Sequence, residues 1–268
     1  MSPSYLDHRL SPPGLSGLVR SVWSLDYDAL TDNLPGTIAP DGQVEFVFQL
    51  GDTCAVSNAV NGRSDTPQAM VFALRHGAMR MEPRGGNRII AFRVAPAVAS
   101  VILRRSLNDL WDRPVALSDV IGAEADRLID RLAAAPRHAI SEVIAAWLLQ
   151  RLRDWGADAA RNLQLQGALS RFAGEPVSTL ADRAGLTDRT LRRYCERYAG
   201  LSPKQLVMSG RVLRACGLLR HGSAMPIADV AYRLGFSDQS AFANAFRHYV
   251  GMTPAKLRAE PLVFCEAP

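Results

Sequence analysis

The sequence predicts an α+β protein with a β-rich N-terminal half and an all-helical C-terminal half. Three observations support this division: short alternating apolar and polar segments before residue 95, apolar residues at helical spacing after it, and two copies of one helical pattern within residues 178–254. We expect an N-terminal domain at residues 1–153, a linker at 154–161 where the sign of the charge balance changes, and a helical domain at 162–260.

The N-terminal half contains several short strand-like segments separated by Gly, Pro or Asn. In DGQVEFVFQLG (41–51) an Asp-Gly turn precedes apolar residues that alternate with mostly polar ones. Similar segments are SVWSLDY (21–27), AMVFAL (69–74) and RIIAFRV (88–94). Short strands divided by turns predict a sandwich or a barrel, and the pattern is compatible with a cupin-like barrel flanked by helices.

Helical segments follow the strands. They are AVASVILRRSL (97–107), residues 119–134, and AISEVIAAWLLQRLRDW (139–155). In the last segment the apolar residues form one broad stripe. Such a stripe fits either packing against the domain's own sheet or pairing with a second copy in a homodimer, and the sequence does not separate the two.

Positive charge is concentrated in the C-terminal half. The chain has 31 Lys and Arg against 26 Asp and Glu, but residues 161–260 hold 15 against 7 and the remainder holds 16 against 19. This balance favours a polyanion-binding domain. No apolar run is long enough to span a bilayer and the first residues lack a signal-peptide pattern, so we expect a cytoplasmic protein without a membrane partner.

An internal repeat is the most specific pattern in the chain. Residues 178–203 (STLADRAGLTDRTLRRYCERYAGLSP) match residues 227–254 (IADVAYRLGFSDQSAFANAFRHYVGMTP). The matched positions of the first copy are Ala181, Gly185, Asp188, Leu191, Gly200 and Ser202-Pro203. The first three recur 50 positions later and the others 51 positions later. The second copy therefore has one extra residue, near the second of its two predicted helices, its recognition helix. Each copy reads as two helices around a glycine-containing turn, which predicts tandem helix-turn-helix units.

A long helix is predicted between the two copies. In PKQLVMSGRVLRACGLL (203–219) Pro203 suits the first turn and the apolar residues recur at helical spacing. About 17 helical residues span roughly 25 Å. A spacer of this order suits two recognition helices set about one DNA turn, roughly 34 Å, apart.

Residues 165–258 resemble the DNA-binding domain of the AraC/XylS family of bacterial transcription regulators. The resemblance is carried by LADRAGLTDRTLRRYCERYAGLSP, RVLRACGLL (211–219) and the run GFSDQSAFANAFRHYVGMTP, which is close to the family's signature. It implies two helix-turn-helix units that bind double-stranded DNA. Two positions depart from the family: Cys195 stands where Phe is usual, and Asn244 stands where a basic residue is common.

The first half resembles an uncharacterised β-rich domain that precedes such modules. In the wider AraC/XylS family this position often holds a cupin-like domain that binds a ligand and dimerises. The resemblance therefore implies a sensing or dimerising domain, without indicating a particular ligand.

In the first unit, helix 188–199 is predicted to bury Leu191, Cys195 and Tyr198 and to expose its polar face. The planar fork of arginine can bond guanine O6 and N7 together. By their family positions, the residues expected to contact base edges are Arg189, Arg192 and Arg193. Arg197 suits a phosphate contact, or is an ordinary surface arginine.

In the second unit, the matching positions carry neutral side chains. Gln and Asn can bond adenine N6 and N7 together, and an alanine methyl can meet a thymine methyl. The expected base contacts are Gln239, Ser240, Ala243 and Asn244, and the expected phosphate contacts are Arg247, Lys204 and Ser237. Ser237 is also the predicted N-cap of the second recognition helix, which is the more ordinary role.

The N-terminal half shows no signature of a metal or catalytic site. A metal-binding cupin needs clustered His and carboxylate ligands, whereas only His8 and His76 lie among the strands. No GxSxG, Walker-type or GxGxxG motif is present, so we expect no catalytic residue, no metal and no cofactor. Residues that suit the wall of a small-molecule pocket, but equally suit ordinary strands, are Trp23, Tyr27, Glu45, Arg75 and Arg93.

These features favour a sequence-specific transcription regulator that is controlled by a small-molecule effector or by homodimerisation. If it is an activator, it also contacts RNA polymerase. One alternative is a DNA-modifying or repair enzyme with an AraC-type DNA-binding appendage, which needs a zinc-held or activated thiol. Cys54, Cys195, Cys216 and Cys265 are widely separated, which predicts free thiols, and only Cys54 lies in the N-terminal half. A second alternative is a protein-interaction module whose basic face does not bind DNA.

Overall fold

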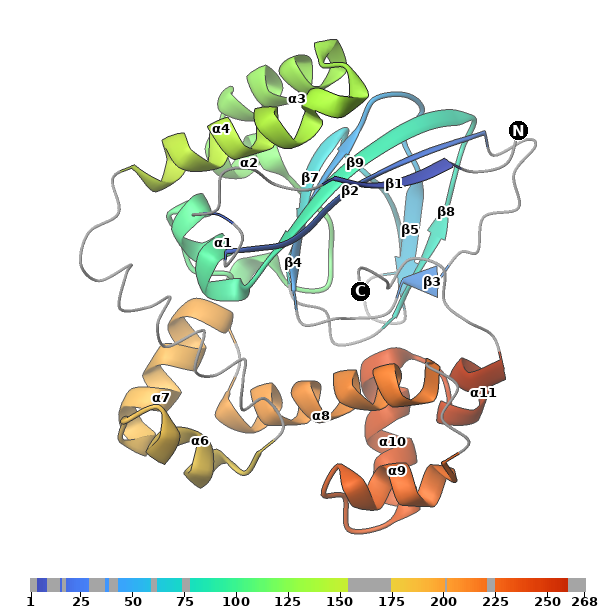
Figure 1. Cartoon of the computed structure of the whole chain (residues 1–268), viewed down its shortest axis with the longest axis vertical. Coiled ribbons are helices and arrows are strands. Elements are labelled where there is room, and N and C mark those ends of the chain that lie inside the picture. Colours follow the sequence, from blue (N-terminus) through green and yellow to red (C-terminus); the bar gives the residue numbers. More distant parts are fainter. Residues whose placement is uncertain are drawn as a thin grey trace.

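A computed structural model describes residues 4–8, 15, 18–28, 37–38, 43–58, 62–73, 78–153, 175–200, 202–220 and 225–259. Among these residues, two sheets and a layer of helices form the N-terminal part, and helices alone form the C-terminal part (Figure 1). The predicted α+β class is confirmed. The predicted linker at 154–161 and the predicted Asp-Gly turn at 41–42 lie outside the described residues.

Within the described residues, ten strands form two antiparallel sheets. The larger has the order β1-β2-β9-β4-β7-β10 and the smaller the order β3-β8-β5-β6. The strands are β1 (Ser4–His8), β2 (Val19–Asp28), β3 (Thr37–Ile38), β4 (Val44–Gln49), β5 (Ala55–Asn58), β6 (Gly62–Asp65), β7 (Ala69–Phe72), β8 (Met79–Glu82), β9 (Gly86–Val94) and β10 (Val115–Ala116).

Both faces of the larger sheet are covered. Successive side chains of a strand point to opposite faces. On β4, Phe46 and Phe48 therefore join the core beneath the helices, whereas Val47 joins the core between the two sheets. The polar residues Glu45 and Gln49 of the same strand are buried as well.

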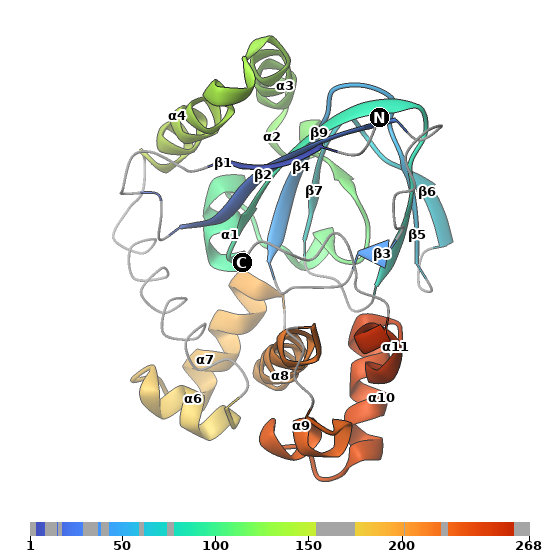
Figure 2. The same cartoon turned by 45° about the vertical axis from the view of Figure 1, so that its right-hand side comes forward.

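The predicted cupin-like barrel is not closed in the part of the chain that the structure describes. The two sheets are separate hydrogen-bonded units that lie face to face, as Figure 2 shows. Helices provide the physical reason, because they bury the outer face of the larger sheet and the strands need not close around a single core.

Four helices cover the larger sheet: α1 (Pro96–Leu103), α2 (Leu117–Ile121), α3 (Glu124–Ala134) and α4 (Ile140–Leu152). The helix predicted at 119–134 is interrupted, because Gly122 adopts a φ of 65° and separates α2 from α3. The apolar stripe of α4 packs on its own sheet: the Trp147 ring lies 6.1 Å from that of Phe46 and 5.9 Å from that of Phe92. Of the two interpretations of this stripe, the structure therefore supports packing within the domain.

The C-terminal part contains the two predicted helical pairs and the predicted spacer. Its helices are α6 (Val177–Arg183), α7 (Asp188–Tyr194), the π-helical turn η4 (Cys195–Ala199), α8 (Pro203–Arg220), α9 (Ile227–Arg233), α10 (Gln239–Val250) and α11 (Pro254–Ala259). Helix α8 runs between the two pairs (Figure 1), and its bounds confirm the spacer predicted at 203–219. None of the helices described is both long and apolar enough for a membrane crossing.

Candidate nucleic-acid interface

Each helical pair turns at a glycine and then starts its recognition helix with a side-chain cap. Gly185 and Gly235 have φ angles of 62° and 74°, which side chains disfavour. The hydroxyl of Thr187 accepts a hydrogen bond from the amide of Thr190 at the start of α7. At the start of α10 the carboxylate of Asp238 accepts one from the amide of Ala241.

These caps correct two expectations. Ser237 is not the N-cap of α10, because its hydroxyl instead donates to the Asp238 carboxylate at 3.0 Å. The structural counterpart of Asp238 is Thr187, 51 positions earlier, rather than Asp188. The extra residue of the second copy therefore lies in the turn, before the recognition helix. From the caps onwards the two recognition helices correspond with a constant offset of 51.

The first recognition helix presents the predicted arginines to solvent. Leu191, Tyr194 and Cys195 are buried, while the exposed residues are Asp188, Arg189, Arg192, Arg193, Glu196 and Arg197. The burial expected for Leu191 and Cys195 is confirmed, and the side chain of Tyr198 lies outside the described ones. Burial, aided by the charge of Glu196, raises the pKa of the Cys195 thiol to about 12, so this thiol is neutral and inert at neutral pH.

Three of the predicted DNA-binding residues meet in one open groove of about 540 Å³. Arg189 and Arg192 of α7 and Lys204 of α8 line it, together with Ser202. Ser202 begins α8 with reciprocal hydrogen bonds: its hydroxyl accepts from the Gln205 amide, and the Gln205 side chain accepts from the Ser202 amide. The carboxylate of Asp188 lines the groove as well. The three side-chain cations outnumber it and lie near the positive end of an 18-residue helix, which suits a phosphate.

Sequence reasoning missed Ser202 as part of this groove. The signal was present, because Ser202 and Gln205 have the spacing of a capping box, in which Ser and a Gln three residues later cap a helix start. The repeat-related Thr253 accepts a hydrogen bond from the Lys256 backbone amide at the start of α11, which is one of the two bonds of that box. In both units, the helix that follows the recognition helix, α8 or α11, therefore begins with a side-chain cap.

The second recognition helix separates its aromatic and polar faces as expected. The ring of Phe242 lies 5.1 Å from that of Phe236 and 5.5 Å from that of Phe246. All three are buried, which confirms that the aromatic stripe is core. The predicted contact residues Ser237, Gln239, Ser240, Asn244 and Arg247 are exposed, and Ala243 is half-buried.

Arg211 is a further cation of this region that the sequence did not single out. It extends from α8, donates to the carbonyl of Gly235 at 2.9 Å, and lies over the Phe236 ring. It therefore supports the turn of the second unit from the spacer helix.

In the N-terminal part, a small cavity of about 30 Å³ lies between the two sheets. Three of the five residues proposed for a pocket line it: Trp23, Glu45 and Arg93. Glu45 accepts from Arg93 at 2.8 Å and from the Trp23 indole at 3.2 Å. Tyr27 is buried nearby but does not line the cavity, and Arg75 lies outside the described residues.

The remaining cavity wall is apolar and comes from both sheets. Its residues are Ile38, Val47, Cys54, Val56, Met70, Phe72, Met81 and Ile89. One buried ion pair in an otherwise apolar chamber can recognise a ligand that is mostly apolar and carries one polar group.

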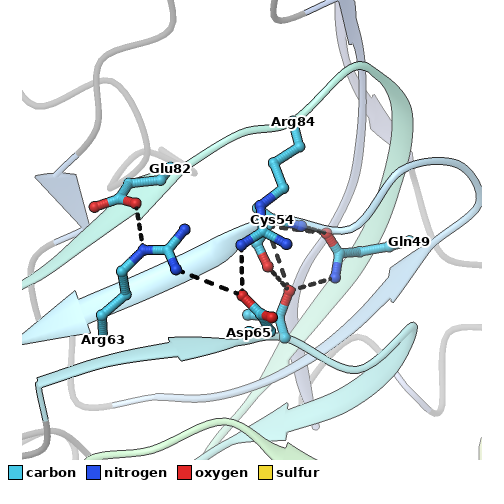
Figure 3. Close-up of polar contacts among 7 residues, drawn as sticks. Gln49, Cys54, Arg63, Asp65, Glu82 and Arg84 are labelled. Carbon is cyan, nitrogen blue, oxygen red and sulfur yellow. Dashed lines mark hydrogen bonds and ion pairs between the residues drawn. The ribbon is translucent and has the colours of Figure 1, made fainter.

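Cys54 lies at the edge of this core in a hydrogen-bonded network (Figure 3). Its thiol donates to the side-chain oxygen of Gln49 at 2.9 Å, and the Thr66 hydroxyl donates to its carbonyl at 2.6 Å. Ion pairs of Arg63 with Glu82 and of Arg84 with Asp65 surround the network. Burial raises the pKa of Cys54, which is the opposite of what a nucleophilic thiol needs.

Comparison with protein families identifies both parts of the chain separately. Residues 180–260 match the family described as "Helix-turn-helix domain", and residues 8–116 match "Domain of unknown function (DUF6597)". Residues 180–260 include both recognition helices and the spacer between them. The C-terminal domain is an AraC-type helix-turn-helix domain. The resemblance found in its sequence is thereby confirmed, and the first half does match a domain without an assigned function.

Curated relatives match this AraC-type domain in extent. The HTH-type transcriptional activator RhaS of Enterobacter sp. (strain 638) is 37% identical over 101 residues, which is 37% of this chain and 36% of that protein. RhaS of Escherichia coli (strain K12 / DH10B) is 37% identical over 98 residues, 36% and 35% of the two chains. The chain thus spans about a third of the length of the curated relatives it matches.

Two solved structures align with the chain over different extents. The DNA-binding domain of AdpA, solved in complex with a target DNA, is 33% identical and aligns with 37% of this chain and 90% of that domain, at a TM-score of 0.32. ToxT from Vibrio cholerae O395 aligns with 98% of this chain and 99% of its own, with 9% identity and a TM-score of 0.46. Because neither TM-score reaches 0.5, the assignment of the AraC-type domain rests on the family match and on the geometry of the two units.

Proposed function

We propose that this protein is a sequence-specific transcription regulator that binds double-stranded DNA with both helix-turn-helix units. One observation carries the proposal: a single AraC-type domain exposes the polar faces of two recognition helices joined by one continuous helix. In both views α6 and α9 lie on the side of the domain away from the sheets (Figures 1 and 2).

The two units have different roles in this proposal. In the first, Arg189, Arg192 and Arg193 contact base edges, while the groove at Lys204 takes a phosphate and Arg197 takes another. In the second, the neutral side chains of Gln239, Ser240, Ala243 and Asn244 read bases, and Arg247 and Ser237 contact the backbone. The first unit therefore supplies more of the salt-dependent affinity.

The N-terminal domain supplies regulation, through a small-molecule effector or through homodimer formation. The inter-sheet cavity is the candidate effector site, since it combines apolar walls with the Glu45–Arg93 ion pair. Its present volume has room for about two water molecules, so a larger effector requires the sheets to move apart. Because RhaS is named an activator, contact with RNA polymerase is a further part of this proposal. Such a regulator works in the cytoplasm.

The alternative of a DNA repair enzyme is not favoured by the environment of Cys54. That thiol is buried, donates a hydrogen bond to the side-chain oxygen of Gln49, and has a raised pKa. A repair nucleophile needs the thiolate at neutral pH.

Selection of bound sequences from random duplex DNA, with and without candidate metabolites, tests the proposal. We expect a preferred site with two contacted segments about one helical turn apart. Replacing both Arg192 and Arg193 with Ala should alter the footprint at the first segment, and replacing the exposed Leu149 of α4, outside the AraC-type domain, with Ala serves as the control. Selection of no preferred sequence, or an unchanged footprint in the double variant, would overturn it.

A further inference from the structure

The N-terminal domain touches the end of the first recognition helix. Ala97 of α1 is fully buried in the core of the first unit, among Leu180, Leu191 and Cys195. In both views α1 lies next to the end of α7 (Figures 1 and 2).

Gly200, which ends the first recognition helix, lies at this contact. A Cβ atom at Gly200 would overlap Trp111 Nε1 and lie 2.6 Å from Asn108 Oδ1. Both residues belong to the N-terminal domain, at the 3-10 helix η2 (Asn108–Leu110) and just after it. We call this approach the first glycine contact.

The second recognition helix ends in the same manner. Gly251 caps α10 with a φ of 77°, and a Cβ atom there would lie 2.9 Å from the Cβ of Ala78. Ala78 directly precedes β8 in the N-terminal domain. We call this approach the second glycine contact. Gly200 and Gly251 occupy equivalent positions of the repeat, 51 residues apart.

The other pair of repeat-related glycines makes no such contact. Among the described residues, a Cβ atom at Gly185 would have no neighbour within 4 Å, and the atoms nearest to one at Gly235 would belong to Arg211 of α8, at 3.6 Å or more. All four glycines have a positive φ, so backbone conformation alone explains a glycine at each. Only Gly200 and Gly251 also allow another domain to approach closely.

The two contacts close a ring of packed elements. One path between the two units runs through α8, and the other runs through the N-terminal domain by way of the two glycine contacts. Helix α8 packs into the cores of both units and so already limits their movement, but it can still bend and twist along its length unless a second connection exists. The N-terminal domain provides that second connection.

We propose that Ala78, Ala97, Asn108 and Trp111 are positioning residues for DNA reading, because they fix the separation and rotation of the two recognition helices. This inference rests on the proposed function. None of the four belongs to the AraC-type domain, and none lies on an exposed recognition face.

The N-terminal segments that carry Ala78 and Ala97, which touch the second and the first unit, also adjoin opposite walls of the inter-sheet cavity. Ala78 leads into β8 of the smaller sheet, whose Met81 lines the cavity. Helix α1 follows β9 of the larger sheet, whose Arg93 lines it. A molecule that separates the two sheets therefore changes the distance between the two glycine contacts. Effector binding is in this way converted into a new spacing of the recognition helices.

The test compares four single variants of the full chain on the selected DNA site and on sites with one base pair inserted between the contacted segments. One inserted base pair moves the segments apart by about 3.4 Å and rotates one about the other. Gly200→Ala and Gly251→Ala disturb the glycine contacts. Gly185→Ala and Gly235→Ala are the matched controls, because they introduce the same backbone strain without a neighbour in the N-terminal domain.

We expect the contact variants to lose spacing selectivity, measured as the ratio of affinities for the selected and the inserted sites, by about 5-fold or more relative to their controls. Combining Gly200→Ala with Trp111→Ala and Asn108→Ala should leave selectivity equally low, because the connection is then absent. Ala78→Arg, a change outside the AraC-type domain, should lower selectivity even if the glycine variants fold poorly.

The positioning role would be overturned if the contact variants kept the same spacing selectivity as their controls and Ala78→Arg kept that of the wild type. The proposed function would remain intact in that case. If wild-type protein selects no duplex sequence, the proposed function itself fails, so the two failures are distinguishable.

Discussion

The two helix-turn-helix units share one fold but are stabilised by different cores. The second is built around Phe236, Phe242 and Phe246, with α8 and α11 completing its cluster, and every member of that cluster lies in the C-terminal domain. The first unit has Cys195 where the second has Phe246, and its cluster includes Ala97 from the N-terminal domain. The first unit therefore depends on a neighbouring domain for part of its core.

The exposed faces of the two recognition helices differ in charge. The first recognition helix exposes Arg189, Arg192 and Arg193, whereas the equivalent positions of the second carry Ser240, Ala243 and Asn244. The unit with the smaller core of its own thus carries the larger positive charge. In the proposed function this difference divides the work: the first unit provides more charge and shares its core with the N-terminal domain, and the second reads bases from a core that lies within the C-terminal domain.

The largest expected effect concerns the two equivalent core positions. Phe246→Ala should destabilise the second unit by about 3–5 kcal/mol, because a buried aromatic ring is lost and a cavity remains. Cys195→Ala should cost only about 1 kcal/mol, since the group removed is of the size of one methylene. Hydrogen exchange of peptides from each unit measures the two local opening free energies separately. Equal losses in both variants would contradict the difference between the cores.

A smaller effect is expected at equivalent surface positions of the recognition helices. Arg193→Ala should remove about 1–3 kcal/mol of discrimination at one base pair and flatten the salt dependence of binding by about one unit of slope. Asn244→Ala should relax base preference in the other segment without changing that slope, because Asn carries no charge. Affinities measured over a series of salt concentrations test both. An equal change of slope in both variants would show that charge is not segregated between the units.

The smallest effect concerns the two N-caps. Hydrogen bonds from the Ala241 amide and the Ser237 hydroxyl lower the pKa of Asp238 below its ordinary value of 3.8. The stabilisation of α10 by this cap is therefore fully present above that value and is lost as the pH falls through the lowered pKa. Thr187 does not titrate, so its cap on α7 should be independent of pH.

Amide exchange of α10 and α7, followed from about pH 6 to about pH 3 and corrected for intrinsic rates, measures this difference. Asp238→Asn is the matched control, because Asn caps a helix without titrating. A loss of α10 protection at low pH in Asp238→Asn as large as in wild type would show that another group is responsible.

Much of the C-terminal domain could be predicted from local patterns. The bounds of α8, the buried stripe of Phe242 and Phe246 and the exposure of Arg192 all follow from helical spacing and one glycine turn per unit. The position of the added residue could not be predicted, because Asp188 and Asp238 are the same residue type and therefore align in the sequence. Only the hydrogen bonds show that Thr187, which caps α7, is the equivalent of Asp238, which caps α10. The mistaken choice of Ser237 as N-cap has the same origin, since adjacent Ser and Asp residues both suit a cap.

In the N-terminal domain the sequence determined that strands form and which residues alternate, but not how the sheets close. Whether β4 faces one core or two depends on helices that lie more than 50 residues away in the chain. The same holds for the apolar stripe of α4, which fits a sheet or a partner equally well until Trp147 is seen against Phe46 and Phe92.

The sequence by itself determined the two helix-turn-helix units, their spacer and the contrast in charge between their outer faces, because local spacing and side-chain chemistry suffice for each. Only the tertiary structure decided that the groove at Lys204 gathers Arg189 and Arg192, and that Gly200 and Gly251 both lie against the N-terminal domain. Contacts between distant segments depend on how whole elements pack, and glycines needed for helix ends look identical in sequence to glycines needed for a close approach.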